Sequence, residues 1–141
     1  MFARKAVDII LRSRSRPWFI YLALHAPHTQ QVDFVDYRSR FPSASKERLG
    51  VLGVMVQQDE AVGRVLAILR ELKQLNQLND TFVFFISDNG GTRRSEGESK
   101  HFTGSLNTPF SGDKGTSLEG GIRVPFIVSW PARLPAGSTC E

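Results

Sequence analysis

The sequence contains a single cysteine, Cys140, beside the last residue. One cysteine can form neither an internal disulfide nor a multi-cysteine metal site. Long apolar runs are absent too, because no stretch reaches the roughly 18–20 residues that a membrane-spanning helix needs. We also expect no signal peptide, since the N-terminal apolar core is short and no small-residue cleavage pattern follows it. What is present, 40% apolar residues with ten phenylalanines in a chain of 141 residues, is typical of a folded globular protein.

Residues 17–141 carry no net positive charge. The net charge of +4 comes from residues 1–16, which hold five basic residues and one acid, whereas the remainder has as many acidic as basic residues. A nucleic-acid-binding domain is expected to carry basic and aromatic residues along a groove, so this distribution predicts no nucleic-acid partner. Residues 1–16 instead predict a short basic amphipathic helix. Four apolar residues form its expected inner side: Phe2, Ala6, Ile9 and Ile10.

The remaining pattern predicts strands that alternate with a long helix. Residues 18–24 and 81–87 are apolar runs without alternation, which is typical of strands covered on both faces. Apolar residues three or four apart, from Leu49 to Leu72, predict one amphipathic helix that starts at Lys46 and is ended by Asn76–Asp80. A third strand is expected over 123–130. This order predicts an α/β fold with a mainly parallel sheet flanked by helices.

Two polar clusters follow the first two expected strands. Right-handed crossovers would place His25–His28 and Asp88–Gly91 at the same edge of the sheet, where open α/β sheets bind ligands. Asp88 and Asn89 are adjacent oxygen donors, which suit a hard cation such as Ca²⁺ or Mg²⁺ better than zinc. The alternative is a turn in which both side chains bond to backbone N–H groups. Ca²⁺ takes about 6–8 oxygens, and this pair supplies only a part of them.

Histidine and lysine add a possible anion site. His25 and His28 flank a proline turn, where a histidine can bind an anion or transfer a proton; the alternative is a loop histidine that bonds to backbone carbonyls. Lys114 lies in a glycine-flanked loop, and its ammonium suits an anionic oxyester; the alternative is a surface lysine in a turn. Asp59 falls within the apolar stripe of the long helix, so we expect it to have a hydrogen-bond or cationic partner.

Five segments together carry a family resemblance. They are His-Ala-Pro-His (25–28), Asp-Glu-Ala-Val-Gly-Arg (59–64), Ser-Asp-Asn-Gly-Gly (87–91), Gly-Asp-Lys-Gly-Thr (112–116) and Glu-Gly-Gly-Ile-Arg-Val-Pro (119–125). In this order and spacing they resemble the type I sulfatases, the arylsulfatase-like branch of the alkaline-phosphatase superfamily. The resemblance covers about residues 17–137 and implies an alkaline-phosphatase-like sulfatase domain.

The resemblance also implies a function and a role for each matching residue. The implied activity is hydrolysis of sulfate monoesters, of carbohydrate or aryl type, with a divalent cation. Asp88 and Asn89 match family metal ligands, which usually hold Ca²⁺, with Mg²⁺ as the alternative. His28 matches a histidine that hydrogen-bonds the sulfate ester, and Lys114 matches a lysine that contacts the same sulfate and supports the leaving oxygen. The segment around Glu119 matches a signature that we interpret as structural.

The chain departs from the family pattern at the nucleophile. The family uses a cysteine in Cys-x-Pro-Ser-Arg, oxidised to formylglycine, and neither this motif nor the tandem aspartates of the first family strand occur in the sequence. Cys140 is no substitute, because only Glu141 follows it. In the family these elements lie further N-terminal and a subdomain follows at the C-terminal side.

We therefore expect a central fragment: one partial domain over 1–141, truncated at both ends. Residues 1–16 would be a basic helix, 17–137 the sulfatase-like body, and the missing N-terminal part of the domain its partner. Alone, it is expected to be inactive. Two alternatives stay open, a phosphodiesterase or phosphonate-ester hydrolase of the same superfamily and a non-catalytic remnant that binds an anion or a metal. The sequence does not indicate a localisation.

Overall fold

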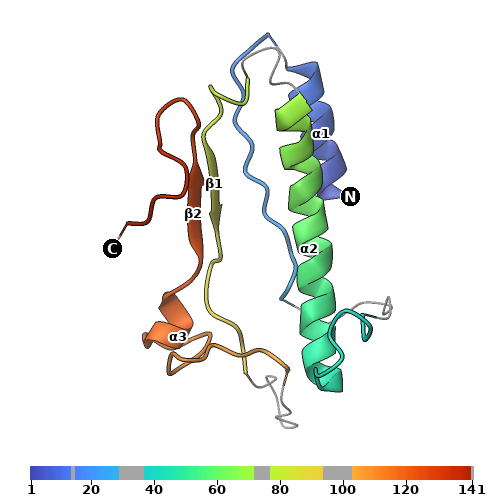
Figure 1. Cartoon of the computed structure of the whole chain (residues 1–141), viewed down its shortest axis with the longest axis vertical. Coiled ribbons are helices and arrows are strands. Elements are labelled where there is room, and N and C mark those ends of the chain that lie inside the picture. The colour runs from blue at the N-terminus through green and yellow to red at the C-terminus, as the bar shows by residue number, and fades with distance from the viewer. Residues whose placement is uncertain (14, 29–36, 72–76, 94–102, 141) are drawn as a thin grey trace. The chain divides into compact units, whose positions relative to one another are not determined.

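The computed structural model describes residues 1–13, 15–28, 37–71, 77–93 and 103–140. In chain order the elements are α1 (Phe2–Arg12), α2 (Lys46–Glu71), β1 (Val83–Ile86), α3 (Glu119–Ile122) and β2 (Phe126–Ser129) (Figure 1). These residues form two compact units. Unit 1 comprises Met1–His25, Gln58–Phe84 and Ile127–Glu141, and unit 2 comprises Ala26–Gln57 and Phe85–Phe126.

The core of unit 1 is formed by α1 and the C-terminal part of α2. Ile10 of α1 and Leu69 of α2 are 1% and 2% exposed. Seven partly buried apolar side chains pack around them: Trp18, Ile20, Val65, Leu66, Ile68, Leu78 and Val83. Burial of apolar surface of this kind is the main favourable contribution to folding.

A helix is present within residues 1–16 but ends at Arg12, and its buried face differs from the prediction. Ala6 and Ile10 are buried as expected, whereas Phe2 and Ile9 are about half exposed and Ala3 is buried instead. Residues 3, 6 and 10 are three and four positions apart, so they form one stripe along the helix. The two alanines are small, which lets this stripe pack closely.

Helix α2 is confirmed from Lys46, and its first turn is capped. Ser45 Oγ accepts a hydrogen bond from the Arg48 amide at 3.2 Å, as an N-cap serine does. The described part of α2 ends at Glu71, and of the predicted end at Asn76–Asp80 the structure describes residues 77–80, which form a turn. The expectation for Asp59 is wrong: its side chain is exposed, and within the described ranges it forms no hydrogen bond or ion pair.

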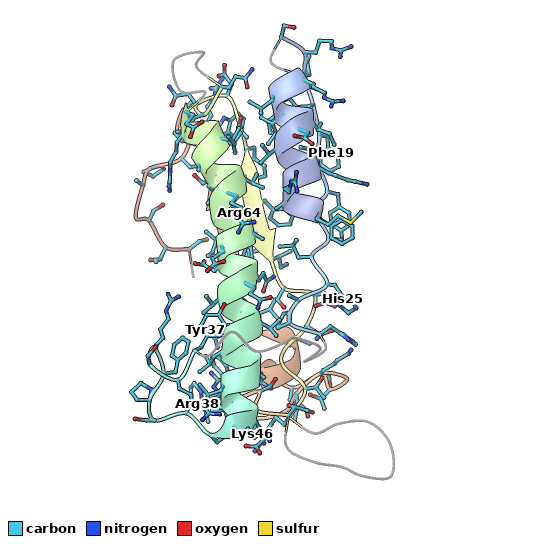
Figure 2. The ribbon with its side chains drawn as sticks, turned by 90° about the vertical axis from the view of Figure 1, so that its right-hand side faces the viewer. Phe19, His25, Tyr37, Arg38, Lys46 and Arg64 are labelled. Atoms are coloured by element: carbon cyan, nitrogen blue, oxygen red, sulfur yellow. The ribbon has the colours of Figure 1, made fainter. Side chains whose placement is uncertain are left out.

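The first predicted strand is extended but is not a strand in the structure. Residues 18–24 pair with no strand in the part of the chain that the structure describes. Their burial alternates: Trp18 and Ile20 pack on the core of unit 1, whereas Phe19 and Tyr21 are 89% and 83% exposed. Phe19 is labelled in Figure 2. The expectation of cover on both faces is therefore wrong for the described residues, which cover only one face.

The other two predicted strands are present and pair with each other. β1 and β2 lie within the predicted ranges 81–87 and 123–130 and form a two-stranded antiparallel sheet (Figure 1). In unit 1 the rings of Phe82 and Trp130 meet edge to face, with centroids 5.8 Å apart. The mainly parallel sheet stays a prediction, because this pair does not test it. Of the helices described, none has both the length and the apolar character needed to cross a membrane.

Candidate functional site

The turn after β1 is held by its own side chains. Asp88 Oδ1 accepts a hydrogen bond from the Asn89 amide at 3.0 Å, and Asn89 Nδ2 donates to the Gly90 carbonyl at 2.9 Å. Ser87 Oγ donates to the Asn89 carbonyl at 2.9 Å. These are the local bonds of the turn interpretation, and they fix the backbone at the carboxyl end of β1.

The same turn is also compatible with a cation. Asp88 is exposed and Asn89 is half-buried. Among the residues that the structure describes, Asp88 Oδ2 and Asn89 Oδ1 accept no hydrogen bond, so both oxygens are available as ligands. Carboxylate and carboxamide oxygens fit a hard cation in kind. They form part of a shell only, since the described ranges contain no group of three or more His, Cys, Asp or Glu side chains that could hold a metal.

Helix α3 docks against this turn through glycines. The Gly90 amide donates to the Gly121 carbonyl at 2.9 Å. A Cβ atom at Gly90 would lie 1.8 Å from the Gly120 carbonyl oxygen, so no side chain fits at this position. The close approach of the two backbones therefore requires glycine.

The other side of α3 holds the loop that carries Lys114. The Gly120 amide donates to the Ser111 carbonyl at 2.7 Å, and Gly120 is buried. Within the loop, Thr116 Oγ1 accepts from the Asp113 amide at 3.2 Å and donates to the Asp113 carbonyl at 2.8 Å. Helix α3 thus joins the Asp88 turn to the Lys114 loop inside unit 2.

The residues of the signature around Glu119 contact one another and a neighbouring aromatic ring. Arg123 Nη1 lies 2.9 Å from Glu119 Oε1, one helical turn away. The same guanidinium lies over the Phe110 ring, 4.9 Å from its centroid. Together with the buried glycines of α3, these contacts agree with our interpretation that the signature shapes the backbone beneath the site.

Asn107 is a residue of the site that sequence analysis missed. Its Oδ1 accepts from the Gly91 amide at 3.0 Å, and its Nδ2 donates to the carbonyls of Gly91 at 2.8 Å and Gly112 at 3.1 Å. One side chain therefore bridges the Asp88 turn and the Lys114 loop. The sequence carries no distinct signal for this role, because an asparagine before Thr-Pro is an ordinary turn residue.

Lys114 meets one of the two predicted histidines. Lys114 Nζ lies 2.9 Å from His28 Nε2, and the two residues are 86 positions apart in the sequence. A lysine ammonium only donates hydrogen bonds, so His28 Nε2 accepts and its ring proton is on Nδ1. His28 is exposed and Lys114 is half-buried. The histidine of this pair is His28. His25, labelled in Figure 2, belongs to unit 1.

The chain is similar in sequence to known sulfatases. The Sulfatase family matches residues 1–139, which includes the N-terminal helix that sequence analysis placed ahead of the sulfatase-like body. The chain is 37% identical over 140 residues to N-acetylgalactosamine-6-sulfatase of Canis lupus familiaris, covering 97% of this chain and 24% of that protein. It is 36% identical over 137 residues to steryl-sulfatase of Mus musculus, covering 96% and 20%.

A solved structure has the same fold. The chain superposes on Ps i-CgsB, crystallised in complex with k-i-k-neocarrahexaose, with a TM-score of 0.79 and 35% identity. The match covers 96% of this chain and 28% of that one. The chain thus spans about a quarter of the length of the proteins it matches. The division into a basic helix and one partial domain stays a prediction.

Proposed function

Because this chain belongs to the sulfatase family, we propose that it supplies the sulfate-binding and part of the cation-binding side of a hydrolase for sulfate monoesters. The observation that carries the proposal is the Lys114–His28 pair, 2.9 Å apart, in the same unit as the Asp88 turn. Helix α3 and Asn107 link the Lys114 loop to that turn. The proposed catalytic residues are therefore His28 and Lys114, and the proposed metal ligands are Asp88 and Asn89.

Lys114 and His28 suit the charge of a sulfate ester. Negative charge is spread over the sulfate oxygens and grows on the leaving oxygen as the S–O bond breaks, so fixed donors at these oxygens lower the barrier. The Lys114 ammonium has three N–H donors and uses one toward His28. The others are available to the ester and to the leaving oxygen. His28 orients the ammonium through Nε2, and its Nδ1–H is the group that would donate to a second sulfate oxygen.

The cation part of the proposal rests on donor chemistry. Asp88 Oδ2 and Asn89 Oδ1 would hold Ca²⁺, or Mg²⁺ as the alternative, and the remaining oxygens would come from water, substrate or other protein groups. When bound, the cation would neutralise the charge of the sulfate oxygens. Asn89 Nδ2 and Asp88 Oδ1 form hydrogen bonds with the backbone of the turn. These bonds hold both side chains, and so restrict the positions of the two ligand oxygens.

The proposal includes a larger sheet and a saccharide substrate. We propose that residues 18–24 and β1 are strands of a mainly parallel, alkaline-phosphatase-like sheet; the TM-score of 0.79 over 96% of the chain supports this. Of the named relatives, one is named for an amino sugar and one was crystallised with a hexaose, so a carbohydrate sulfate is favoured over an aryl sulfate. The sulfatase names also favour sulfate over phosphate esters.

Isothermal titration calorimetry tests the binding part of the proposal. The chain is titrated with CaCl₂ and then with sodium sulfate, and we expect millimolar sulfate binding that strengthens with Ca²⁺. Lys114→Ala should weaken sulfate binding, whereas Arg64→Ala, on the exposed surface of α2, should not. Absence of sulfate binding, or equal binding by the Lys114 variant, would contradict the proposal.

An activity assay tests whether these residues can hydrolyse a sulfate ester without the family's cysteine motif. None of the 141 residues forms a Cys-x-Pro-Ser-Arg motif, so we propose that these residues bind cation and sulfate without turnover. The chain is incubated with an aryl sulfate in the presence of Ca²⁺, and no hydrolysis above background is expected. Hydrolysis that disappears in the Lys114→Ala variant would show that these residues suffice for catalysis and would overturn this part of the proposal.

A further inference from the structure

We propose that Asn107 is a positioning residue that couples cation binding at the Asp88–Asn89 turn to anion binding at Lys114. The inference rests on the proposed function of these two sites. Asn107 lies in none of the five segments that carry the family resemblance. Its role follows from the hydrogen bonds of its side chain alone.

The first step is that Asn107 holds both peptide groups of Gly91. Oδ1 accepts from the Gly91 amide at 3.0 Å, and Nδ2 donates to the Gly91 carbonyl at 2.8 Å. This is a strand-like pairing made by a side chain. Gly91 is two residues beyond Asn89, so the pairing fixes the peptide segment that leaves the proposed cation ligands.

The second step is that the same nitrogen also contacts the Lys114 loop. Asn107 Nδ2 also donates to the Gly112 carbonyl at 3.1 Å. Gly112 is two residues before Lys114 in a loop that is already closed by Thr116. A carboxamide offers one acceptor and two donors in a single plane, and all three are used here on two segments. A shift of the Asp88 turn is therefore transmitted to the backbone that carries Lys114.

The third step is that Asn107 is not the only connection between the two segments. Helix α3 joins them through the Gly90–Gly121 and Gly120–Ser111 backbone hydrogen bonds. Loss of the Asn107 side chain should therefore leave unit 2 folded and each ion site present. What should be lost is the coupling, by which Ca²⁺ raises the affinity for sulfate and sulfate raises the affinity for Ca²⁺ by the same factor.

The experiment measures this factor by calorimetry on the full chain, with sodium sulfate titrated in the absence and presence of saturating CaCl₂. We expect Ca²⁺ to raise sulfate affinity by about fivefold or more in the wild type. The factor should fall toward one in Asn107→Ala and in Asn107→Asp, which keeps the acceptor and loses both donors. The matched control Asn79→Ala, in unit 1, should keep the wild-type factor.

The outcomes separate the coupling from the proposed function. A purely structural role would lower both affinities and leave their coupling factor unchanged, which would overturn the inference. If the wild type binds neither ion, the proposed function fails, and amide hydrogen exchange then decides the role of Asn107. The Asp113 amide, which is bonded to Thr116 and not to Asn107, should exchange about tenfold faster in Asn107→Ala. Unchanged exchange there would overturn the inference on its own.

Discussion

Lys114 Nζ lies 2.9 Å from His28 Nε2, so a loop lysine and a histidine from the proline turn form one polar pair in unit 2. The pair has one fixed polarity, because the ammonium can only donate and the imidazole nitrogen must accept. The ammonium keeps two further N–H groups, and the imidazole keeps its Nδ1–H, as donors for an anionic ester. The pair is the basis of the first prediction.

Replacing Lys114 with methionine should weaken sulfate binding more than replacing His28 with alanine. Methionine keeps most of the length and apolar stem of lysine but removes the positive charge. A hydrogen bond to a charged group contributes about 1.5–3 kcal/mol, which corresponds to about a tenfold or larger loss of affinity. The measurement is calorimetric titration with sodium sulfate in CaCl₂. Affinity of Lys114→Met within twofold of the wild type would rule out a direct contact.

Asp88→Asn should remove most of the Ca²⁺ affinity. The substitution keeps size and shape and still leaves an acceptor for the Asn89 amide, so the turn should remain folded. It removes the one carboxylate of the proposed ligand pair, and the Ca²⁺ affinity of a site depends on the number of charged ligands. Calcium titration should show at least about a tenfold loss. Asp80→Asn, at the exposed turn before β1, is the matched control and should bind as the wild type does.

Gly120→Ala should destabilise the folded chain by about 1–3 kcal/mol. A Cβ atom there would lie 2.2 Å from the Gly112 carbonyl oxygen and 2.7 Å from that of Ser111, so the backbone must move. The free energy of unfolding is measured by urea denaturation. Gly63→Ala is the contrasting control: its Cβ would meet no atom within 4 Å, and removal of a helical glycine should stabilise by about 0.5–1 kcal/mol. Equal midpoints for the two variants would refute the packing of α3.

Leu69→Ala should cost about 2–5 kcal/mol of unfolding free energy, because it leaves a cavity beside Ile10 in the core of unit 1. Thermal or urea denaturation measures the loss. Leu134→Ala makes the same chemical change at a partly exposed position and should alter stability by less than about 0.5 kcal/mol. A small effect of the Leu69 substitution would mean that α1 does not pack against α2 in solution.

The exposed aromatic residues of the extended segment should promote self-association of the chain. Phe19 and Tyr21 are almost fully exposed on one face of residues 18–24, and large exposed apolar patches favour association. The double substitution of Phe19 and Tyr21 by lysine should lower the fraction of oligomer in sedimentation measurements at equal concentration. The same substitutions should leave the core of unit 1 intact, because Trp18 and Ile20 carry its packing. A wild-type chain that stays monomeric with a sharp cooperative melting transition would contradict this prediction.

Local patterns were sufficient to predict the helices but not the first strand. The three-to-four spacing from Lys46 predicted α2, and the mixed apolar and basic start predicted α1. A strand, by contrast, requires a hydrogen-bonded partner elsewhere in the chain, and residues 18–24 have none among the described residues. The predicted buried face of α1 was only half correct, because Ala3 is buried whereas Phe2 and Ile9 are about half exposed.

For the candidate site, too, sequence motifs select individual residues but do not predict their contacts. Asp88, Asn89, His28 and Lys114 could be selected from sequence, since each lies in a short motif with the spacing of a sulfatase. The contact of Lys114 with His28 could not be derived from spacing, and neither could the bridging role of Asn107. Both depend on loops that approach each other only after folding.

The sequence by itself determined the family, through short motifs in a fixed order, and it determined the helices α1 and α2, the positions of β1 and β2 and the chemistry of the available ligands. Each of these depends on residues that are neighbours in the chain. Only the tertiary structure decided which of these residues meet. Glycine backbones at Gly90 and Gly120 approach closely enough to join the turn to α3, and Asn107 then links that turn to the Lys114 loop. Such contacts arise between segments distant in sequence, and their geometry is set by packing that no local pattern encodes.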